Sequence, residues 1–165
     1  MHLSLTSIIS AVFLALSLSV AAVPVTEDTP SLEIRSNWHK NKNHKVTVGD
    51  WNKLLYDPQY VHAKPGDTIE FEFHPKNHTV TESSFDYPCQ RLESGYAFRT
   101  GFVPVPLTQT SHFPTRKYTV PDDKPHWFYC GQTGHCPAGM VFAVNPPKHG
   151  NTFHKFQAKA KASGK

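Results

Sequence analysis

The sequence predicts an all-β domain, built as an antiparallel β-sandwich of about seven short strands. Charged residues make up 18% of the 165 residues, whereas aromatic residues reach 12% and there are 14 prolines, a composition more typical of a β-rich domain than of a helical bundle. Apolar and polar residues alternate in short segments, and no helical period or internal repeat is sustained. Turn residues separate these segments at fairly regular spacing, which favours a sandwich of short strands.

The predicted strands follow from this alternation. Residues 46–48 alternate, and so do residues 68–73, where Ile69, Phe71 and Phe73 share one face and acidic residues the other. The turn Pro65-Gly66-Asp67 leads into this second strand. The other five predicted strands are residues 79–81, 107–112, 118–120, 126–130 and 140–144. Helix is expected only as a turn or two near residues 51–56 or around residues 85–90.

The amino-terminal segment predicts export. Residues 1–22 are interpreted as a signal peptide, because no charged side chain lies between Leu3 and Val23 and the run ends in the small residues Val20-Ala21-Ala22. A retained membrane anchor is the alternative, since the run is about long enough to span a bilayer. No cluster of Lys or Arg follows it, which favours cleavage. We therefore expect a secreted protein, extracellular or associated with the cell wall, with an N-terminal linker at 23–42 and one domain at 43–146.

Residues 147–165 are predicted to be a basic flexible tail. This segment contains no acidic residue and five lysines: Lys148, Lys155, Lys159, Lys161 and Lys165. Such a tail could bind an anionic surface or wall polymer, or it could simply increase solubility. The net charge of +4 is modest, and basic residues do not interleave with an aromatic platform, so nucleic acid is not an expected partner. We expect a monomer without a transmembrane anchor.

The stretch from Trp127 to Met140 contains the candidate metal ligands. Cys130, His135 and Met140 are separated by four residues each, and they offer a thiolate, an imidazole and a thioether. The three glycines of this loop permit a tight backbone that can fold the side chains toward one point. A second imidazole would complete a trigonal site of two histidines and one cysteine with a weak axial methionine, the arrangement of blue copper.

His78 is the candidate for that second imidazole, because it lies at the start of a short strand in which Val80 would share its inward side. Other histidines could take its place from the residues alone. These are His62, His74, His112 and His126.

Two stretches resemble the cupredoxin family. They are Asn77-His78-Thr79-Val80 followed by Pro88-Cys89, and Cys130-Gly131-x3-His135-Cys136-x2-Gly139-Met140. The likeness covers about residues 45–145, and it is strongest to the phytocyanins and to small secreted cupredoxin-like proteins of fungi. The three cysteines alone allow three pairings. The resemblance implies a Greek-key sandwich, one copper ion held by His78, Cys130, His135 and Met140, and a disulfide between Cys89 and Cys136.

The sequence departs from the family at two places. Plant members usually have Asn directly after the first histidine, where it helps to tie the two ligand loops together, whereas Thr79 stands here. Stellacyanins have Gln at the axial position, whereas Met140 stands here. Because a thioether stabilises Cu(I) better than an amide oxygen does, we predict a higher reduction potential than in a Gln-ligated relative.

These observations predict a secreted type 1 (blue) copper protein that carries one electron and is not an enzyme. The alternative is extracellular copper capture, or a wall-associated binding protein without a redox partner. A multicopper oxidase needs His-x-His pairs, which are missing from this sequence, and a histidine brace needs His at the mature amino terminus, where Val23 is expected. A zinc protease helix at His74 is excluded by Pro75. The sequence does not name the redox partner.

Asn77 begins the one N-glycosylation sequon of the chain, Asn77-His78-Thr79. It is therefore a candidate glycosylation site, although a glycan there would be crowded by the predicted ligand loop.

Overall fold

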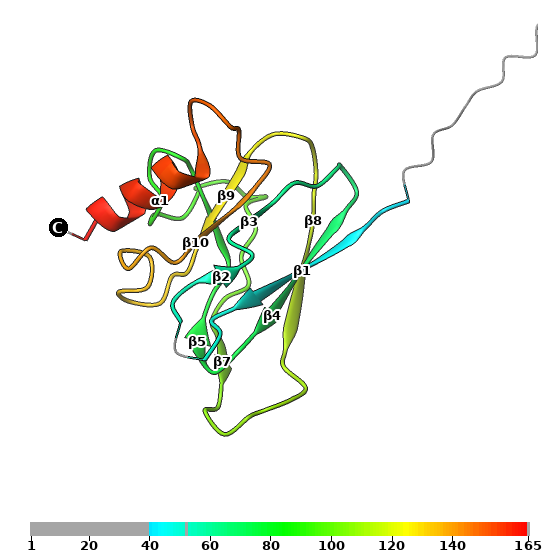
Figure 1. Ribbon diagram of the computed structural model, residues 1–165, viewed down its shortest axis with the longest axis vertical. Helices are drawn as coiled ribbons and strands as arrows, with labels where there is room; N and C mark the ends of the chain where they lie inside the picture. Colours follow the sequence, from blue (N-terminus) through cyan, green and yellow to red (C-terminus); the bar gives the residue numbers. More distant parts are fainter. Residues whose placement is uncertain (1–39, 52, 165) are drawn as a thin grey trace, which may run out of the picture. The chain divides into compact units, whose positions relative to one another are not determined.

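The computed structural model describes residues 40–51 and 53–164 (Figure 1). The predicted signal peptide and most of the predicted linker lie outside these residues. The described part holds ten strands and one helix: β1 (Asn43–Val48), β2 (Tyr56–Asp57), β3 (Tyr60–Val61), β4 (Thr68–Phe73), β5 (Lys76–His78), β6 (Thr81–Ser83), β7 (Val103–Val105), β8 (Thr115–Thr119), β9 (His126–Tyr129), β10 (Val141–Val144) and α1 (Phe153–Ala162).

The strands form a sandwich of two four-stranded sheets. The first sheet has the order β2-β1-β4-β8, and the second has the order β3-β10-β9-β6, while β5 and β7 form a separate pair. Apolar side chains of both sheets meet in one cluster, which we call the inner core. Its fully buried members include Val46, Ile69 and Phe71 from the first sheet and Phe128 and Phe142 from the second. The predicted all-β sandwich is therefore confirmed.

Alternation explains how the central strand faces this core. In β4 the three apolar side chains are fully buried, and the intervening Thr68, Glu70 and Glu72 are only partly buried. A strand turns successive side chains to opposite faces, so this pattern places one face in the core and the other toward solvent.

The strand count and the pairing differ from the prediction. There are ten strands in the described chain rather than about seven, and two pairs are parallel: β1 with β4, and β3 with β10. The chain changes sheets between β2 and β3, where only Pro58 and Gln59 separate a strand of the first sheet from a strand of the second. After β3 the chain returns to the first sheet as β4, which lies beside β1. This return gives the parallel pair of β1 and β4.

The predicted strand at residues 107–112 is wrong, because the structure is irregular there. The side chain of Leu107 is 69% exposed and His112 has a positive φ of 53°. The alternation in this segment therefore marks no buried face.

The carboxyl-terminal segment is not the predicted flexible tail, since most of it forms α1 (Figure 1). The helix begins after Thr152, whose side chain accepts a hydrogen bond from the Lys155 amide, as an N-cap residue does. Phe153, Phe156 and Ala160 lie on one face and are buried. The helix predicted near residues 51–56 or 85–90 is not formed in the described residues of those segments.

The buried face of α1 creates a second cluster, which we call the outer core. It joins the three helix residues to the outward side chains of the second sheet, and its members are Trp127, Cys136, Val141, Ala143, Phe153, Phe156 and Ala160. The second sheet is thus covered on both faces.

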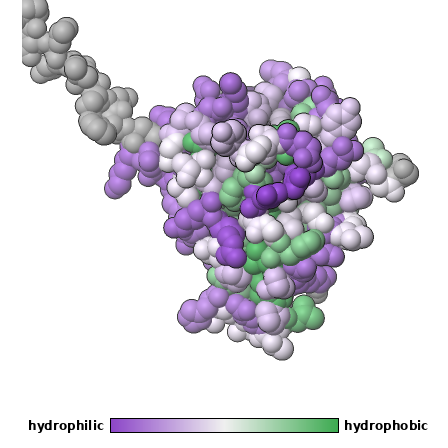
Figure 2. Space-filling view, turned by 180° about the vertical axis from the view of Figure 1, so that it is seen from behind, coloured by the Kyte–Doolittle hydropathy of each residue, from purple (hydrophilic) through white to green (hydrophobic). Residues whose placement is uncertain are grey.

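The surface in Figure 2 is mostly hydrophilic, with hydrophobic side chains gathered in its lower part. Six large hydrophobic side chains are exposed in the described chain: Trp51, Tyr60, Tyr87, Tyr96, Phe102 and Leu107. None of the helices formed by the described residues has the length and apolar character needed to cross a bilayer.

Candidate metal centre

Three of the four predicted ligands lie together at one end of the sandwich. The Cys130 Sγ lies 3.3 Å from His135 Nδ1 and 3.8 Å from His78 Nδ1. The ligand atoms of all three residues lie within 4.8 Å of one another, and no second group of this kind is found among residues 40–51 and 53–164. His78 ends β5 and Cys130 directly follows β9, so two different sheets hold the site.

Gly49 fixes the orientation of the His78 ring. A Cβ at this position would lie 2.1 Å from His78 Nε2, so the ring packs directly against the glycine backbone. Gly49 also has a positive φ of 74°, which a residue with a side chain rarely adopts. The Nε2 side of the ring is thereby closed, and Nδ1 is the nitrogen that faces Cys130.

Backbone hydrogen bonds close the loop that carries the other ligands. The Cys130 amide donates to the Met140 carbonyl over 3.1 Å, and the Met140 amide donates to the His135 carbonyl over 3.0 Å. Met140 is completely buried and belongs to the inner core together with Cys130. The loop therefore leaves the sheet at Cys130 and rejoins it after Met140 with both residues turned inward.

Thr79 ties the two ligand segments together. Its Oγ1 accepts a hydrogen bond from the Gly131 amide over 2.7 Å, and its own amide donates to the Cys130 Sγ over 3.4 Å. Its carbonyl accepts from the Tyr56 hydroxyl over 2.6 Å. Sequence reasoning recorded Thr79 only as a departure from the family and assigned no role to Gly49 or Tyr56. For Gly49 there was a signal in the sequence, namely a glycine directly after the predicted strand of residues 46–48.

The surroundings keep both imidazoles neutral. Burial, followed by the charge of His135 and of Lys76, lowers the pKa of His78 to about 4. Burial and the charge of Lys76 also lower the pKa of His135. Burial raises the pKa of the Cys130 thiol, although the hydrogen bond from the Thr79 amide opposes this effect. Without a bound cation, both imidazoles and the thiol are therefore neutral at neutral pH. Each imidazole then has one nitrogen lone pair available.

This donor set fits copper. Two imidazoles and one thiolate around a point, with a thioether nearby, are the residues of a type 1 copper site. Both histidines present Nδ1, and the closed Nε2 side of His78 rules out binding through its other nitrogen. A bound cation would stabilise the Cys130 thiolate and so oppose the effect of burial on the thiol pKa, as ligation by a deprotonated sulfur requires.

The four histidines that were alternatives to His78 make different contacts. His74 lies 2.9 Å from Glu72 and stacks on Phe113, whereas His126 lies between two carboxylates. The ring of His62 packs against Tyr60, and His112 is exposed beside Ser111. None of them joins the group around Cys130.

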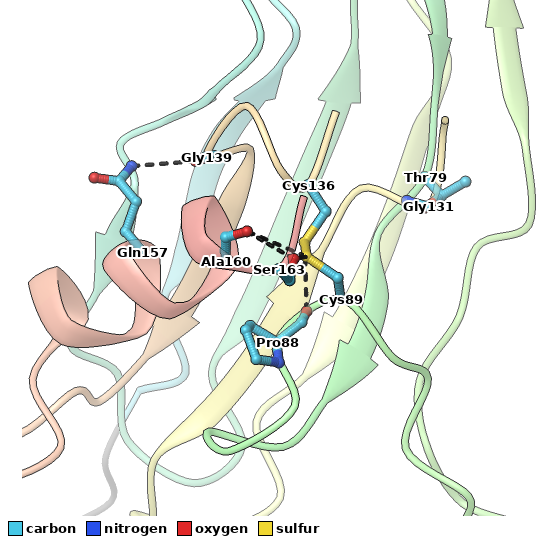
Figure 3. Close-up of a disulfide and its surroundings, with 9 residues drawn as sticks. All are labelled: Thr79, Pro88, Cys89, Gly131, Cys136, Gly139, Gln157, Ala160 and Ser163. Carbon is cyan, nitrogen blue, oxygen red and sulfur yellow. Dashed lines mark hydrogen bonds between the residues drawn. A yellow bond between two sulfur atoms is a disulfide. The ribbon is translucent and has the colours of Figure 1, made fainter. Parts of the chain in front are cut away.

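The disulfide lies directly beside the ligand loop (Figure 3). It joins Cys89 to Cys136 with the Sγ atoms 2.06 Å apart, which is the pairing that the resemblance implied. Cys136 follows the ligand His135, and Cys130 remains the free, buried cysteine. The one cysteine outside the disulfide is thus the residue whose sulfur faces the two histidines.

Asn77 is only partly buried, on β5 opposite Pro104 of β7. Glycosylation of this residue stays a prediction.

Comparisons with known proteins found fungal relatives. No family model matches the chain. It is 28% identical over 127 residues to a protein of Arthroderma benhamiae named "Probable GPI-anchored cupredoxin-1", covering 74% of this chain and 61% of that protein. It is 31% identical over 116 residues to an "Extracellular serine-rich protein" of the same fungus, covering 70% of this chain and 44% of that protein. The chain thus spans between two fifths and two thirds of the length of these relatives.

Solved structures with a similar arrangement of strands include an auracyanin and a pseudoazurin. Reduced auracyanin from Roseiflexus castenholzii is 15% identical with a TM-score of 0.46, covering 62% of this chain and 94% of that one. Pseudoazurin from Hyphomicrobium denitrificans is 18% identical with a TM-score of 0.46, covering 74% of this chain and 98% of that one.

The site and the related sequence both resemble those of the cupredoxin family. A cysteine that faces two histidines at the end of a β-sandwich, a disulfide beside the ligand loop, and the sequence shared with a fungal cupredoxin all point the same way. In its site and in this shared sequence the chain is similar to the cupredoxin family.

Proposed function

We propose that this protein is a secreted type 1 copper protein that carries single electrons. The observation that carries the proposal is the position of the Cys130 Sγ, which faces Nδ1 of both His78 and His135. One copper ion held there would supply Cu(I)/Cu(II) chemistry, and its potential would depend on the axial ligand and on the surroundings of the sulfur. Met140 is the proposed axial ligand, since it is buried in the same core as Cys130.

The chain contributes a site that changes little between oxidation states. His78 is held by the Gly49 backbone, and Cys130 accepts a hydrogen bond from the Thr79 amide. The apolar inner core around the sulfur excludes water. His135 is the least buried of the ligands, so we assign the exchange of electrons with a partner to its ring.

The optical and paramagnetic-resonance spectra of the copper-loaded protein test this proposal. We expect an intense blue thiolate-to-copper band in the wild type and its complete loss in Cys130→Ser. His78→Ala should also lose the type 1 signature, whereas His74→Ala should keep it. A wild-type protein without the band, or a band that persists in Cys130→Ser, would overturn the proposal.

The axial role of Met140 is tested by the reduction potential. Met140→Gln should lower the potential relative to the wild type, because an amide oxygen stabilises Cu(I) less than a thioether does. An unchanged potential would remove Met140 from the ligand set while leaving the three other ligands in place.

Voltammetry separates electron transfer from copper capture. Reversible waves with fast exchange are expected for a carrier, whereas very tight Cu(I) binding with sluggish exchange would favour capture. A site with four protein ligands leaves no position for a substrate, and for this reason we propose a carrier rather than an enzyme.

We further propose that the protein acts outside the cell or at the cell wall. The disulfide supports an oxidising compartment, and both fungal relatives carry names that place them outside the cell or on a membrane anchor. Exposed basic residues near the carboxyl terminus, such as Lys148 and Lys155, could hold an anionic wall polymer. Retention on such a polymer should fall as salt is added.

A further inference from the structure

We infer that helix α1 is a brace for the copper-ligand loop, and that Gln157 is its main positioning residue. This inference rests on the proposed function and deepens it. The brace acts on the backbone of the loop from the side of the outer core, whereas the ligand atoms point to the inner core.

The most direct contact is made at Gly139, the residue before Met140. The Gln157 side chain donates a hydrogen bond from Nε2 to the Gly139 carbonyl over 3.1 Å (Figure 3). The same carbonyl accepts from the Val141 amide over 3.0 Å. Gln157 thus holds the peptide group that joins the end of the loop to the proposed axial ligand.

Gly139 is also covered by the stem of Lys161, which lies one helical turn after Gln157. A Cβ on Gly139 would lie 2.5 Å from Lys161 Cε, and the φ of Gly139 is +98°. The Lys161 side chain therefore occupies the space that a Cβ at position 139 would need, and the positive φ also favours glycine there.

Two further contacts extend the brace along the loop. Phe156 and Ala160 pack in the outer core with Cys136, which is adjacent to the ligand His135. The Ser163 hydroxyl lies 3.0 Å from the Sγ of Cys89 and 2.7 Å from the Ala160 carbonyl (Figure 3). The helix thereby contacts both halves of the disulfide.

The helix itself is fixed independently of the loop. Phe156 packs against Trp127 with a ring distance of 4.7 Å, and Lys159 lies 2.6 Å from Asp86 and over the Phe85 ring. These contacts are made to β9 and to the segment before Cys89. A helix that is anchored elsewhere can transmit rigidity to the loop, which a merely attached segment could not do.

The test compares three substitutions in the full-length protein. Gln157→Met removes the donor without changing charge or length, and Gln157→Lys keeps a donor. His154→Met is the matched control on the exposed side of the same helix. Helix propensity changes little at position 157, because Gln, Met and Lys are similar helix formers.

The first readout is amide hydrogen exchange in the metal-free protein. In Gln157→Met we expect exchange at Met140 and neighbouring loop amides to speed up by roughly threefold to tenfold relative to β4, the effect of losing one hydrogen bond. Gln157→Lys should restore most of the protection, and His154→Met should match the wild type. Unchanged loop exchange in Gln157→Met, or an equal change in His154→Met, would overturn the inference.

The second readout is the copper site itself. Gln157→Met should shift the blue band, the copper hyperfine splitting and the reduction potential, whereas His154→Met should leave all three unchanged. Identical spectra and potential in Gln157→Met would show that α1 is only a structural cover. If the wild type forms no blue site, the proposed function fails, and the exchange data still decide whether the helix braces the loop.

Discussion

The inner and outer cores use opposite faces of the same two strands, yet they hold different parts of the metal centre. Phe128 and Phe142 point into the inner core, while Trp127 and Ala143 point into the outer core. The inner core contains the side chains of Cys130 and Met140, whereas the outer core contains Cys136 and none of the proposed ligands. The donor atoms are thus held from inside, and the backbone that carries them is held from outside.

The two cores also differ in how they are assembled. The inner core is filled by both sheets, and its central Phe71, Phe128 and Phe142 rings contact one another. The outer core is closed by one helix from the end of the chain and by one disulfide. We therefore expect the inner core to carry more of the stability and the outer core to carry more of the adjustment of the site.

The largest effect is expected from a paired truncation of two fully buried phenylalanines. Phe128→Ala should lower the free energy of unfolding by up to about 5 kcal/mol, because four aromatic rings around it lose contact. Phe156→Ala should cost about 3 kcal/mol, since its ring contacts are those with Trp127 and Phe85 and a helix can shift to fill the space. Urea unfolding of the metal-free proteins measures both. Equal losses of unfolding free energy in the two variants would contradict the expectation that the inner core carries more of the stability.

Removal of the disulfide is expected to rank next. The bond spans a sequence separation of 47, so its loss in Cys89→Ala/Cys136→Ala should cost about 4 kcal/mol through the entropy of the unfolded chain. The blue band should survive at low temperature, because Cys130 and both histidines are retained. Thermal unfolding followed in the blue band measures the loss, with a wild type unfolded under the same conditions as control. If the double variant never forms a blue site, the disulfide is needed to hold the copper ligands in place.

Sequence reasoning reached the inner core and the ligands because both leave short-range patterns. Alternation in residues 68–73 gave the buried face of β4, and the spacing of Cys130, His135 and Met140 gave the loop. The choice of His78 among five histidines needed the family resemblance, since the contact with Cys130 spans 52 residues.

The outer core escaped prediction for a physical reason. Phe153, Phe156 and Ala160 form a narrow apolar stripe among lysines, and such a segment is stable as a helix only where a partner surface buries it. That surface is the outward face of β9 and β10. The parallel pairs were not predicted, because the pairing of these strands depends on the change of sheets between β2 and β3. No local sequence pattern marks this change.

The connection between the two ligand segments is tested at Thr79. Thr79→Val should cost about 1 kcal/mol, because the Gly131 amide loses its acceptor while the shape of the side chain is kept. The variant should also broaden or shift the blue band, since the loop that carries Cys130 loses its tie to β5. Thr79→Ser keeps the hydroxyl and should resemble the wild type in both measurements. A Val variant with wild-type stability and spectrum would show that the Thr79 hydroxyl does not hold the loop.

The smallest effect lies at the far end of β9 from the ligands, where charged groups rather than either apolar core hold the strand. His126 Nδ1 lies 3.1 Å from Glu82, and Nε2 lies 3.0 Å from Asp122. The hydrogen bond to Glu82, followed by that to Asp122, raises the pKa of His126 above 6.5. Between about pH 6.5 and this raised pKa the folded protein binds a proton that the unfolded chain does not, so stability must fall as the pH rises.

The contribution of His126, taken as the unfolding free energy of the metal-free wild type minus that of His126→Gln, should therefore decline from about pH 6.5 to pH 8. The lowered pKa values of His78 and His135 act in the opposite direction, because the unfolded chain still loses these two protons near pH 6.5. Both proteins share this rise, so it cancels in the difference. The raised pKa of Cys130 adds a fall at higher pH, so the series ends at about pH 8. A difference that stays constant over this range would remove His126 from the groups that set the pH dependence, whereas a falling difference would assign that part of it to the charged end of β9.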